Sequence, residues 1–280
     1  MEDCGINFYI MKRIREVDII RSLAILLVVF THCFAVYTGS WTNPNPELVK
    51  HIFGYKVFTD LLSAFRMPAV VLIAGYVFTY FQQARPQSFS SIVKSKFKRL
   101  IIPSYVFGVI YIISFRDFNL KSFIIDLTSG VGHLWFLPML FWCFLFGYFL
   151  VRISNIKIQI FTLVMLFLVS LVSPLLPNIL GISRALFFVP FYYLGCILWK
   201  NRSYFKDKII NRKNLIFIIS VFIILFVTIS FYKYCYFNNN LIGKMILLTS
   251  EIVLKTIGVL AFYLITMFFV KTKIGKFLIG

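Results

Sequence analysis

The chain has 280 residues, of which 60% are hydrophobic and 14% are charged, and its mean hydropathy is +0.88. Soluble domains are about 45–50% apolar and about 25% charged, so the composition excludes an ordinary soluble protein. The net charge of +19 does not indicate nucleic-acid binding, because apolar stretches of membrane length separate the basic residues. We therefore predict a polytopic membrane protein that has the lipid bilayer, and no nucleic acid, as a partner.

Eight apolar stretches approach the length of about 20 residues that a helix needs to cross a bilayer. They cover residues 18–38, 57–81, 100–115, 133–151, 158–176, 184–199, 213–232 and 244–270. Continuous apolar runs of this length lack the two-residue alternation of a membrane barrel. The fold class is therefore predicted to be an all-α membrane bundle of about eight spans.

The basic residues predict the orientation of these spans. Nineteen of the 29 Lys and Arg lie before the first span, after the last span, or in the loops 82–99, 152–157 and 200–213. Since cytoplasmic loops carry the excess of positive charge, both termini are predicted to be cytoplasmic.

The first span carries a cation and an imidazole on one face. Arg21 and His32 are 11 residues apart, about three helical turns, which separates them by about 16 Å along the axis. Asp18 is one turn before Arg21 and can pair with it. Alone, Arg21 is typical of a residue that extends to the membrane surface, and His32 of a packing histidine. Their common face favours a functional pair instead.

The second span contains Arg66 close to its middle, next to Pro68, which removes a backbone hydrogen bond and invites a kink. A charge at the bilayer centre costs about 2.5–3.5 kcal/mol. Apolar sequence on both sides makes a surface-reaching side chain a poor explanation for Arg66. It is predicted to have a functional role or a buried partner, and Asp60, six residues earlier, lies on a different helical face.

Later spans contain further polar groups. His133 and Trp135 open the fourth span on the outer side, where a tryptophan by default belongs to the interfacial aromatic belt. Glu251 and Lys255 are four residues apart in the last span, which favours a structural ion pair. The five cysteines form no cluster with histidine, so no metal site is predicted.

The basic stretch 91–100 precedes Pro103 and mixes Lys and Arg with apolar residues. Its simpler interpretation is an anchor at the cytoplasmic interface. A contribution to binding an anionic cytoplasmic ligand remains the alternative.

Five segments together resemble the acyltransferase-3 family of integral membrane acyltransferases, particularly members that O-acetylate cell-surface sugars. They include a basic residue, ten residues and a histidine in the first span, and the Met-Pro and Gly-Tyr pairs of the second. In chain order the segments are Glu16–His32, Phe65–Tyr76, Arg99–Tyr105, His133–Leu137 and Phe191–Gly195. The resemblance implies one acyltransferase domain over residues 1–280, in the bacterial cytoplasmic membrane.

The resemblance further implies transfer of an acetyl group from cytoplasmic acetyl-CoA, without a metal, to a hydroxyl of a polysaccharide or lipid-linked sugar. His32 is then the candidate base, because imidazole titrates near neutral pH. Arg21 and Arg66 are candidates for holding phosphates or the oxyanion. His133 and Trp135 are candidates for binding the acceptor, and Asp18 and Glu251 for structural ion pairs.

Two alternatives remain open at this stage. Intramembrane Arg and His also suit a transporter or flippase of lipid-linked sugars, although no inverted repeat is visible. The family normally has about ten spans, and the segment Lys276–Gly280 resembles the start of its final helix. We therefore expect the domain to be incomplete at its C-terminus, which leaves an inactive homologue as the second alternative.

Overall fold

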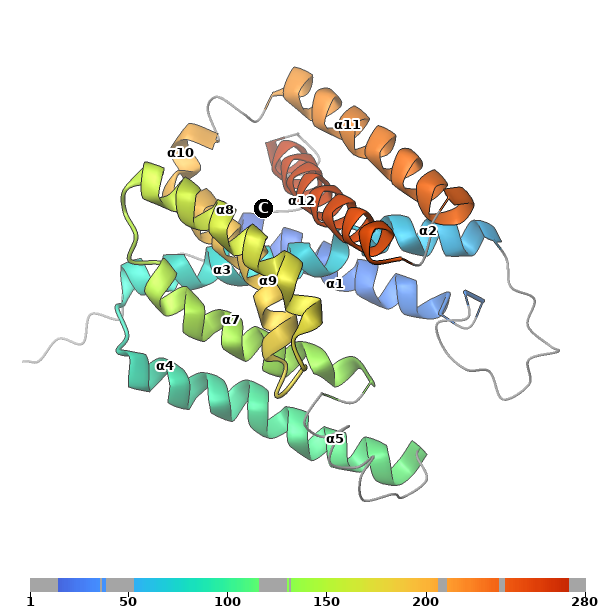
Figure 1. The fold of residues 1–280 in the computed structure, drawn as a ribbon. Coiled ribbons are helices and arrows are strands. Elements are labelled where there is room, and N and C mark those ends of the chain that lie inside the picture. The colour runs from blue at the N-terminus through green and yellow to red at the C-terminus, as the bar shows by residue number, and fades with distance from the viewer. Residues whose placement is uncertain are drawn as a thin grey trace, which may run out of the picture.

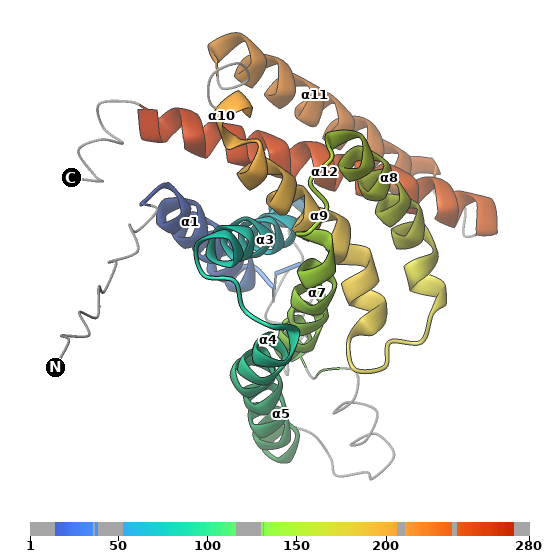
Figure 2. The same ribbon diagram turned by 90° about the vertical axis from the view of Figure 1, so that its left-hand side faces the viewer.

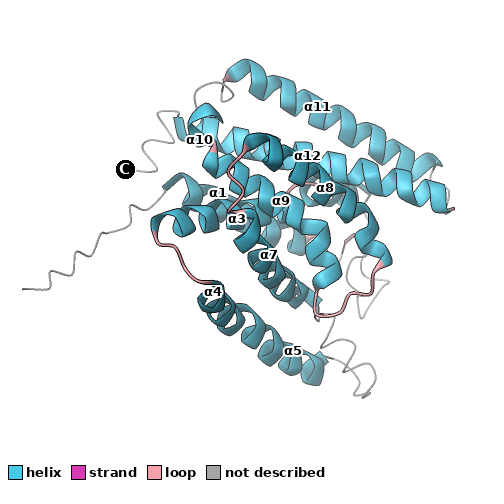
Figure 3. Cartoon of the chain, turned by 60° about the vertical axis from the view of Figure 1, so that its left-hand side comes forward, coloured by secondary structure: helices cyan, strands magenta, loops and turns pink. Residues whose placement is uncertain are grey.

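The computed structural model describes residues 15–35, 37–38, 53–115, 130, 132–205, 211–236 and 240–271. These residues form helices and short connections, with no strand among them (Figure 3). The helices are α1 (Arg15–Cys33), α2 (Phe53–Ser63), α3 (Arg66–Ala84), α4 (Phe89–Lys96), α5 (Ile102–Phe115), α7 (Phe136–Leu150), α8 (Ile156–Val172), α9 (Ile182–Lys200), α10 (Arg202–Tyr204), α11 (Arg212–Phe231) and α12 (Leu241–Lys271). Two π-helical segments (Phe97–Ile101 and Tyr232–Tyr236) and two 3₁₀ turns (Gly132–Trp135 and Ser173–Leu175) extend these helices.

Within the described residues, seven helical segments are long and apolar enough to cross a membrane, so the protein is a multi-pass membrane protein. They are Phe53–Ala84, Phe89–Ser114, Gly132–Leu150, Ile156–Leu175, Ile182–Lys200, Arg212–Tyr236 and Ile242–Val270. They correspond to the second to eighth predicted spans. The first predicted span forms α1, which is not one of the seven, because its 19 residues include Arg15, Glu16, Asp18 and Arg21. The family landmark Lys276–Gly280 lies outside the described residues.

Helix α9 is the centre of the bundle and packs against α3, α7 and α8. Helix α1 lies along α3, and α11 pairs with α12. Figures 1 and 2 show α11 and α12 on one side of this centre and the continuous α4–α5 helix on the other. The predicted interfacial stretch 91–100 is therefore the first part of a spanning helix.

Two glycines bring α3 and α9 into backbone contact. A Cβ atom on Gly75 would clash with the carbonyl oxygen of Tyr192, and one on Gly195 would clash with that of Leu72. Small residues allow this close approach between membrane helices, which are held mainly by van der Waals packing. The α3–α9 pair therefore forms a rigid wall against which the polar residues are placed.

The second predicted span is two helices rather than one kinked helix. Helix α2 ends at Ser63, and α3 starts at Arg66 after Phe65, whose φ is −131°. Pro68 lies in the first turn of α3 and has no N–H to donate to the carbonyl of Ala64, as a continuous helix would require. The break consequently makes Arg66 the first residue of a helix in the middle of a membrane span.

Candidate active site

Two histidines that are 101 residues apart in sequence meet at one end of the bundle. His32 is the penultimate residue of α1, and His133 lies in the 3₁₀ turn before α7. Their ring centroids are 4.4 Å apart and their planes are inclined by 76°. The sequence marked both residues, but it did not predict that they form a pair.

The backbone around His133 is fixed by two glycines. Gly130 and Gly132 have φ values of 84° and 50°, which favour glycine. A Cβ atom on Gly130 would lie 2.6 Å from Cα of Trp135. In addition, Ser104 Oγ of α5 donates to the carbonyl of Leu134 at 3.5 Å. The turn that carries His133 is therefore held closely against α5 and α7.

Arg66 completes this group, because its guanidinium lies within electrostatic range of the His133 imidazole. The Nε and Nη1 atoms of Arg66 are buried and have no hydrogen-bond partner among the described residues. Leaving a buried donor unpaired costs about 1–3 kcal/mol, more for a charged group. Two such donors beside an imidazole pair are suited to an acceptor that a ligand brings, such as a carbonyl oxygen or an oxyanion.

Trp135 lies two residues from His133 and packs against α9. The guanidinium of Arg184 is 5.0 Å from the centroid of its ring, and the ring of Phe188 is inclined by 32° at 6.0 Å. A cation over a tryptophan face is favourable. Nothing in the sequence around Arg184 indicates that it reaches Trp135.

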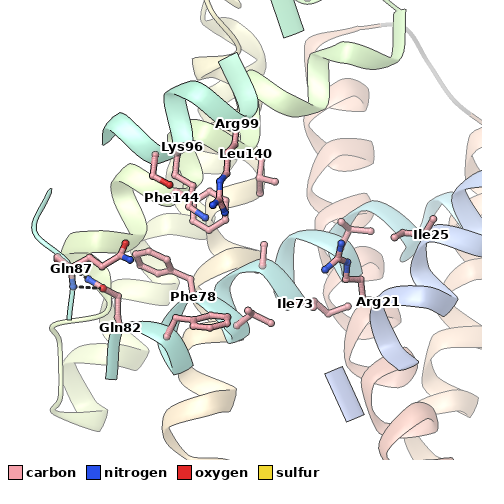
Figure 4. Close-up of a pocket in the computed structure, with 15 residues that line it drawn as sticks. Arg21, Ile25, Ile73, Phe78, Gln82, Gln87, Lys96, Arg99, Leu140 and Phe144 are labelled. Carbon is pink, nitrogen blue, oxygen red and sulfur yellow. Dashed lines mark hydrogen bonds between the residues drawn. The ribbon is translucent and has the colours of Figure 1, made fainter. Parts of the chain in front are cut away.

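A cavity of about 620 Å³ runs between α1, α3, α4 and α7 (Figure 4). Its walls are mostly apolar, and three cations reach it from two sides: Arg21 from α1, and Lys96 and Arg99 from the α4–α5 helix. Gln87 also lines the cavity, and its backbone N–H donates a hydrogen bond to Oε1 of Gln82 at 2.9 Å. This cation end of the cavity combines fixed positive charge with amide groups, which suits an anionic ligand.

The cavity follows one face of α3. Its lining residues on this helix are Val70, Ile73, Ala74, Val77, Phe78, Phe81 and Gln82. Arg66 is four residues before Val70 and so lies on the same face, about 24 Å from Gln82 along the axis. On α1, His32 is seven residues after the lining residue Ile25, again on one face. The cation end and the His32–Arg66–His133 group therefore lie along the same helix faces.

Lys96 and Arg99 are placed by an irregular stretch of helix. The backbone N–H of Ile102 bonds to the carbonyl of Phe97, five residues earlier, which is the π-helical pattern. Pro103 follows and cannot donate to the carbonyl of Arg99. The Lys96 ammonium lies 3.8 Å from the centroid of the Phe144 ring. The sequence identified this basic stretch, but not which of its cations enter the cavity.

The residues expected in ion pairs lie elsewhere. Asp18 is a half-buried residue of α1, one turn before Arg21. Lys255 Nζ is 2.9 Å from Glu251 Oε2. That pair lines a second cavity of about 220 Å³ between α2, α11 and α12, together with Asp60. Asp60 Oδ2 accepts a hydrogen bond from the Tyr234 hydroxyl at 2.6 Å.

A family model described as an acyltransferase domain matches residues 14–279. No curated protein and no solved structure matches the chain. Among the described residues, no group of three or more His, Cys, Asp or Glu is arranged to hold a metal ion.

Proposed function

The chain belongs to the acyltransferase-3 family and is a membrane acyltransferase, and from this premise we propose that it moves an acetyl group from cytoplasmic acetyl-CoA to a sugar hydroxyl. The acceptor is a cell-surface polysaccharide or a lipid-linked sugar, and the site of action is the bacterial cytoplasmic membrane. The observation that carries this proposal is the meeting of His32 and His133 beside Arg66, which has two buried donors without a partner among the described residues.

The cation end of the cavity is suited to the donor. Arg21, Lys96 and Arg99 supply fixed positive charge for the phosphates of coenzyme A. The predicted topology places the start of the α4–α5 helix on the cytoplasmic side, where the donor is made. The apolar walls that follow would take the extended pantetheine arm and lead the thioester along α3 toward Arg66.

The proposed chemistry is a single displacement at the acyl carbon. The imidazole of His32 accepts the proton of the acceptor hydroxyl while its oxygen bonds to the thioester carbon. The carbonyl oxygen gains negative charge, and the Nε–H and Nη1–H groups of Arg66 donate hydrogen bonds to it. When the tetrahedral intermediate breaks down, the carbon–sulfur bond cleaves and the proton held by His32 passes to the thiolate. The products are the sugar ester and coenzyme A.

His133 and Trp135 are assigned to the acceptor side. The His133 ring lies against that of His32, so a hydroxyl that approaches one imidazole is within reach of the other. The Trp135 ring, which packs against Arg184 and Phe188, would border the sugar.

The proposal is tested on polysaccharide isolated from cells that carry the wild type, no gene, or His32→Gln. We expect one O-acetyl group, measured by NMR, to disappear without the gene and with His32→Gln, while the amount of polysaccharide stays the same. The exposed neighbour Cys33 supplies the matched control Cys33→Ser, which should retain the group. Unchanged acetylation in cells lacking the gene, or loss of polysaccharide export instead of acetylation, would contradict the proposal.

A further inference from the structure

Tyr192, in the middle of α9, has a feature that the proposed chemistry does not use. Its side chain is fully buried, and its hydroxyl has no hydrogen-bond partner among the described residues. The ring fits between α3 and α7 because Gly147 has no side chain: a Cβ atom there would clash with the Tyr192 ring. The bundle therefore makes room for the whole phenol but provides nothing for its hydroxyl to bond.

A buried hydroxyl without a partner is destabilising, and such groups are rare in native proteins. Phenylalanine would fill the same space without this cost. The hydroxyl is therefore explained if it gains a partner in another state of the protein, and two rings that contact Tyr192, those of Phe78 and Phe144, line a cavity of about 620 Å³ that can admit one.

Two aromatic side chains link Tyr192 to that cavity. The rings of Phe78 and Phe144 line the cavity, and their centroids are 6.1 Å and 5.6 Å from the centroid of the Tyr192 ring. On its cavity side, Phe144 carries the Lys96 ammonium at 3.8 Å. Lys96, Phe144 and Tyr192 thus form a row of contacts that begins at the cation end, with the Phe144 and Tyr192 rings edge to face.

We propose that Tyr192 is a positioning residue for the arm of the acyl donor, an inference that rests on the proposed function. When Lys96 binds a phosphate of the donor, Phe144 loses its cation–π partner and its ring can turn aside. The Tyr192 hydroxyl then reaches the cavity and donates a hydrogen bond to an amide carbonyl of the pantetheine arm.

The chemistry of the arm and of the wall supports this assignment. The arm contains two amides between the phosphates and the thioester, whereas the α3 wall beside it is formed by Val70, Ile73, Ala74 and Val77. An amide carbonyl buried against aliphatic side chains needs a donor. The Tyr192 hydroxyl can serve as this donor without first breaking a hydrogen bond to another described residue.

The test compares Tyr192→Phe with Tyr193→Phe in full-length protein in lipid nanodiscs. The Tyr193 hydroxyl is also buried but faces Thr162 of α8, so it is the matched control. We expect Tyr192→Phe to weaken acetyl-CoA binding and raise the KM for acetyl-CoA about three- to tenfold, with kcat unchanged. Adenosine 3′,5′-bisphosphate, which has phosphates but no arm, should bind equally to all three proteins.

Each outcome decides the inference. If the wild type binds acetyl-CoA and Tyr192→Phe binds it as tightly as Tyr193→Phe does, the inference is wrong and the proposed function stands. If the wild type does not bind acetyl-CoA, both fail. Thermal unfolding without donor supplies a second readout: a lower melting temperature for Tyr192→Phe would mean that the hydroxyl already has a partner in the protein, and would overturn the inference.

Discussion

The cavity and the His32–Arg66–His133 group are built from different kinds of residue. In the cavity, Arg21, Lys96 and Arg99 come from separate turns and helices and surround an open volume. Further along the same faces of α1 and α3, the rings of His32 and His133 are in contact beside the half-buried Arg66 at a helix start. Fixed cations on long side chains bind phosphates, whereas imidazoles in contact can accept and return a proton. The difference separates binding from chemistry along one wall of the bundle.

This separation gives opposite kinetic signatures. A change at the histidine end should lower kcat, because it removes an interaction that forms only in the transition state, and a change at the cation end should raise the KM for the donor. The variants below test whether the two groups of residues differ in their effects on kcat and KM.

The largest effect is expected for His32→Gln. Loss of the general base should lower kcat by about 10²–10⁴-fold, with the acetyl-CoA dissociation constant unchanged. The measurement is the rate of free coenzyme A release by purified protein in nanodiscs at saturating acceptor. A variant that keeps the wild-type rate would remove His32 from the chemistry.

Arg66→Gln should follow, with kcat lower by about 10²–10³-fold, as for the loss of an oxyanion donor. Arg66→Lys keeps the charge but not the two aligned N–H groups, so its rate should lie between those of Arg66→Gln and the wild type. Lys255→Gln, which removes a membrane cation paired with Glu251, is the control for general loss of charge. Equal rates for Arg66→Gln and Lys255→Gln would show that Arg66 has no special role.

At the opposite end, Lys96→Gln and Arg99→Gln should each raise the KM for acetyl-CoA about ten- to a hundredfold and leave kcat unchanged. A hydrogen bond to a charged group contributes about 1.5–3 kcal/mol, and a tenfold change in affinity corresponds to about 1.4 kcal/mol. Lys98 lies in the same stretch, is exposed and does not line the cavity, so Lys98→Gln is the matched control. A similar KM for all three variants would mean that the donor does not bind in this cavity.

The smallest effect on catalysis is expected for Gly75→Ala, which acts on the packing of α3 and not on a reacting group. The added methyl group pushes against the Tyr192 carbonyl oxygen and should destabilise the bundle by about 1–3 kcal/mol. It should lower the melting temperature and affect kcat and KM together. At Gly54 a Cβ atom meets nothing within 4 Å, so Gly54→Ala should melt as the wild type does. Equal melting of both variants would contradict the close α3–α9 packing.

The sequence predicted those features that depend on local periodicity. Apolar length located the spans, and helical spacing placed Arg21 and His32 on one face, because both follow from the geometry of a single helix. The contact of His32 with His133 could not be predicted, since it depends on how α1 and α7 pack around α3. Nor could the position of the α2–α3 break: Pro68 indicated a distortion, but whether a helix bends or divides depends on its neighbours. The contacts of Tyr192 with Phe78 and Phe144 likewise depend on how the helices pack.

The central claim, that the donor binds in the cavity and the chemistry takes place at the His32–Arg66–His133 group, is tested most directly by the double variant Arg66→Gln/Arg99→Gln beside its two single variants. The measurement is the steady-state rate of acetyl transfer as a function of acetyl-CoA concentration. Changes at distant sites are expected to add in free energy. The double variant should therefore combine the lower kcat of Arg66→Gln with the higher KM of Arg99→Gln, each unchanged in size. A higher KM from Arg66→Gln together with a lower kcat from Arg99→Gln would contradict the claim.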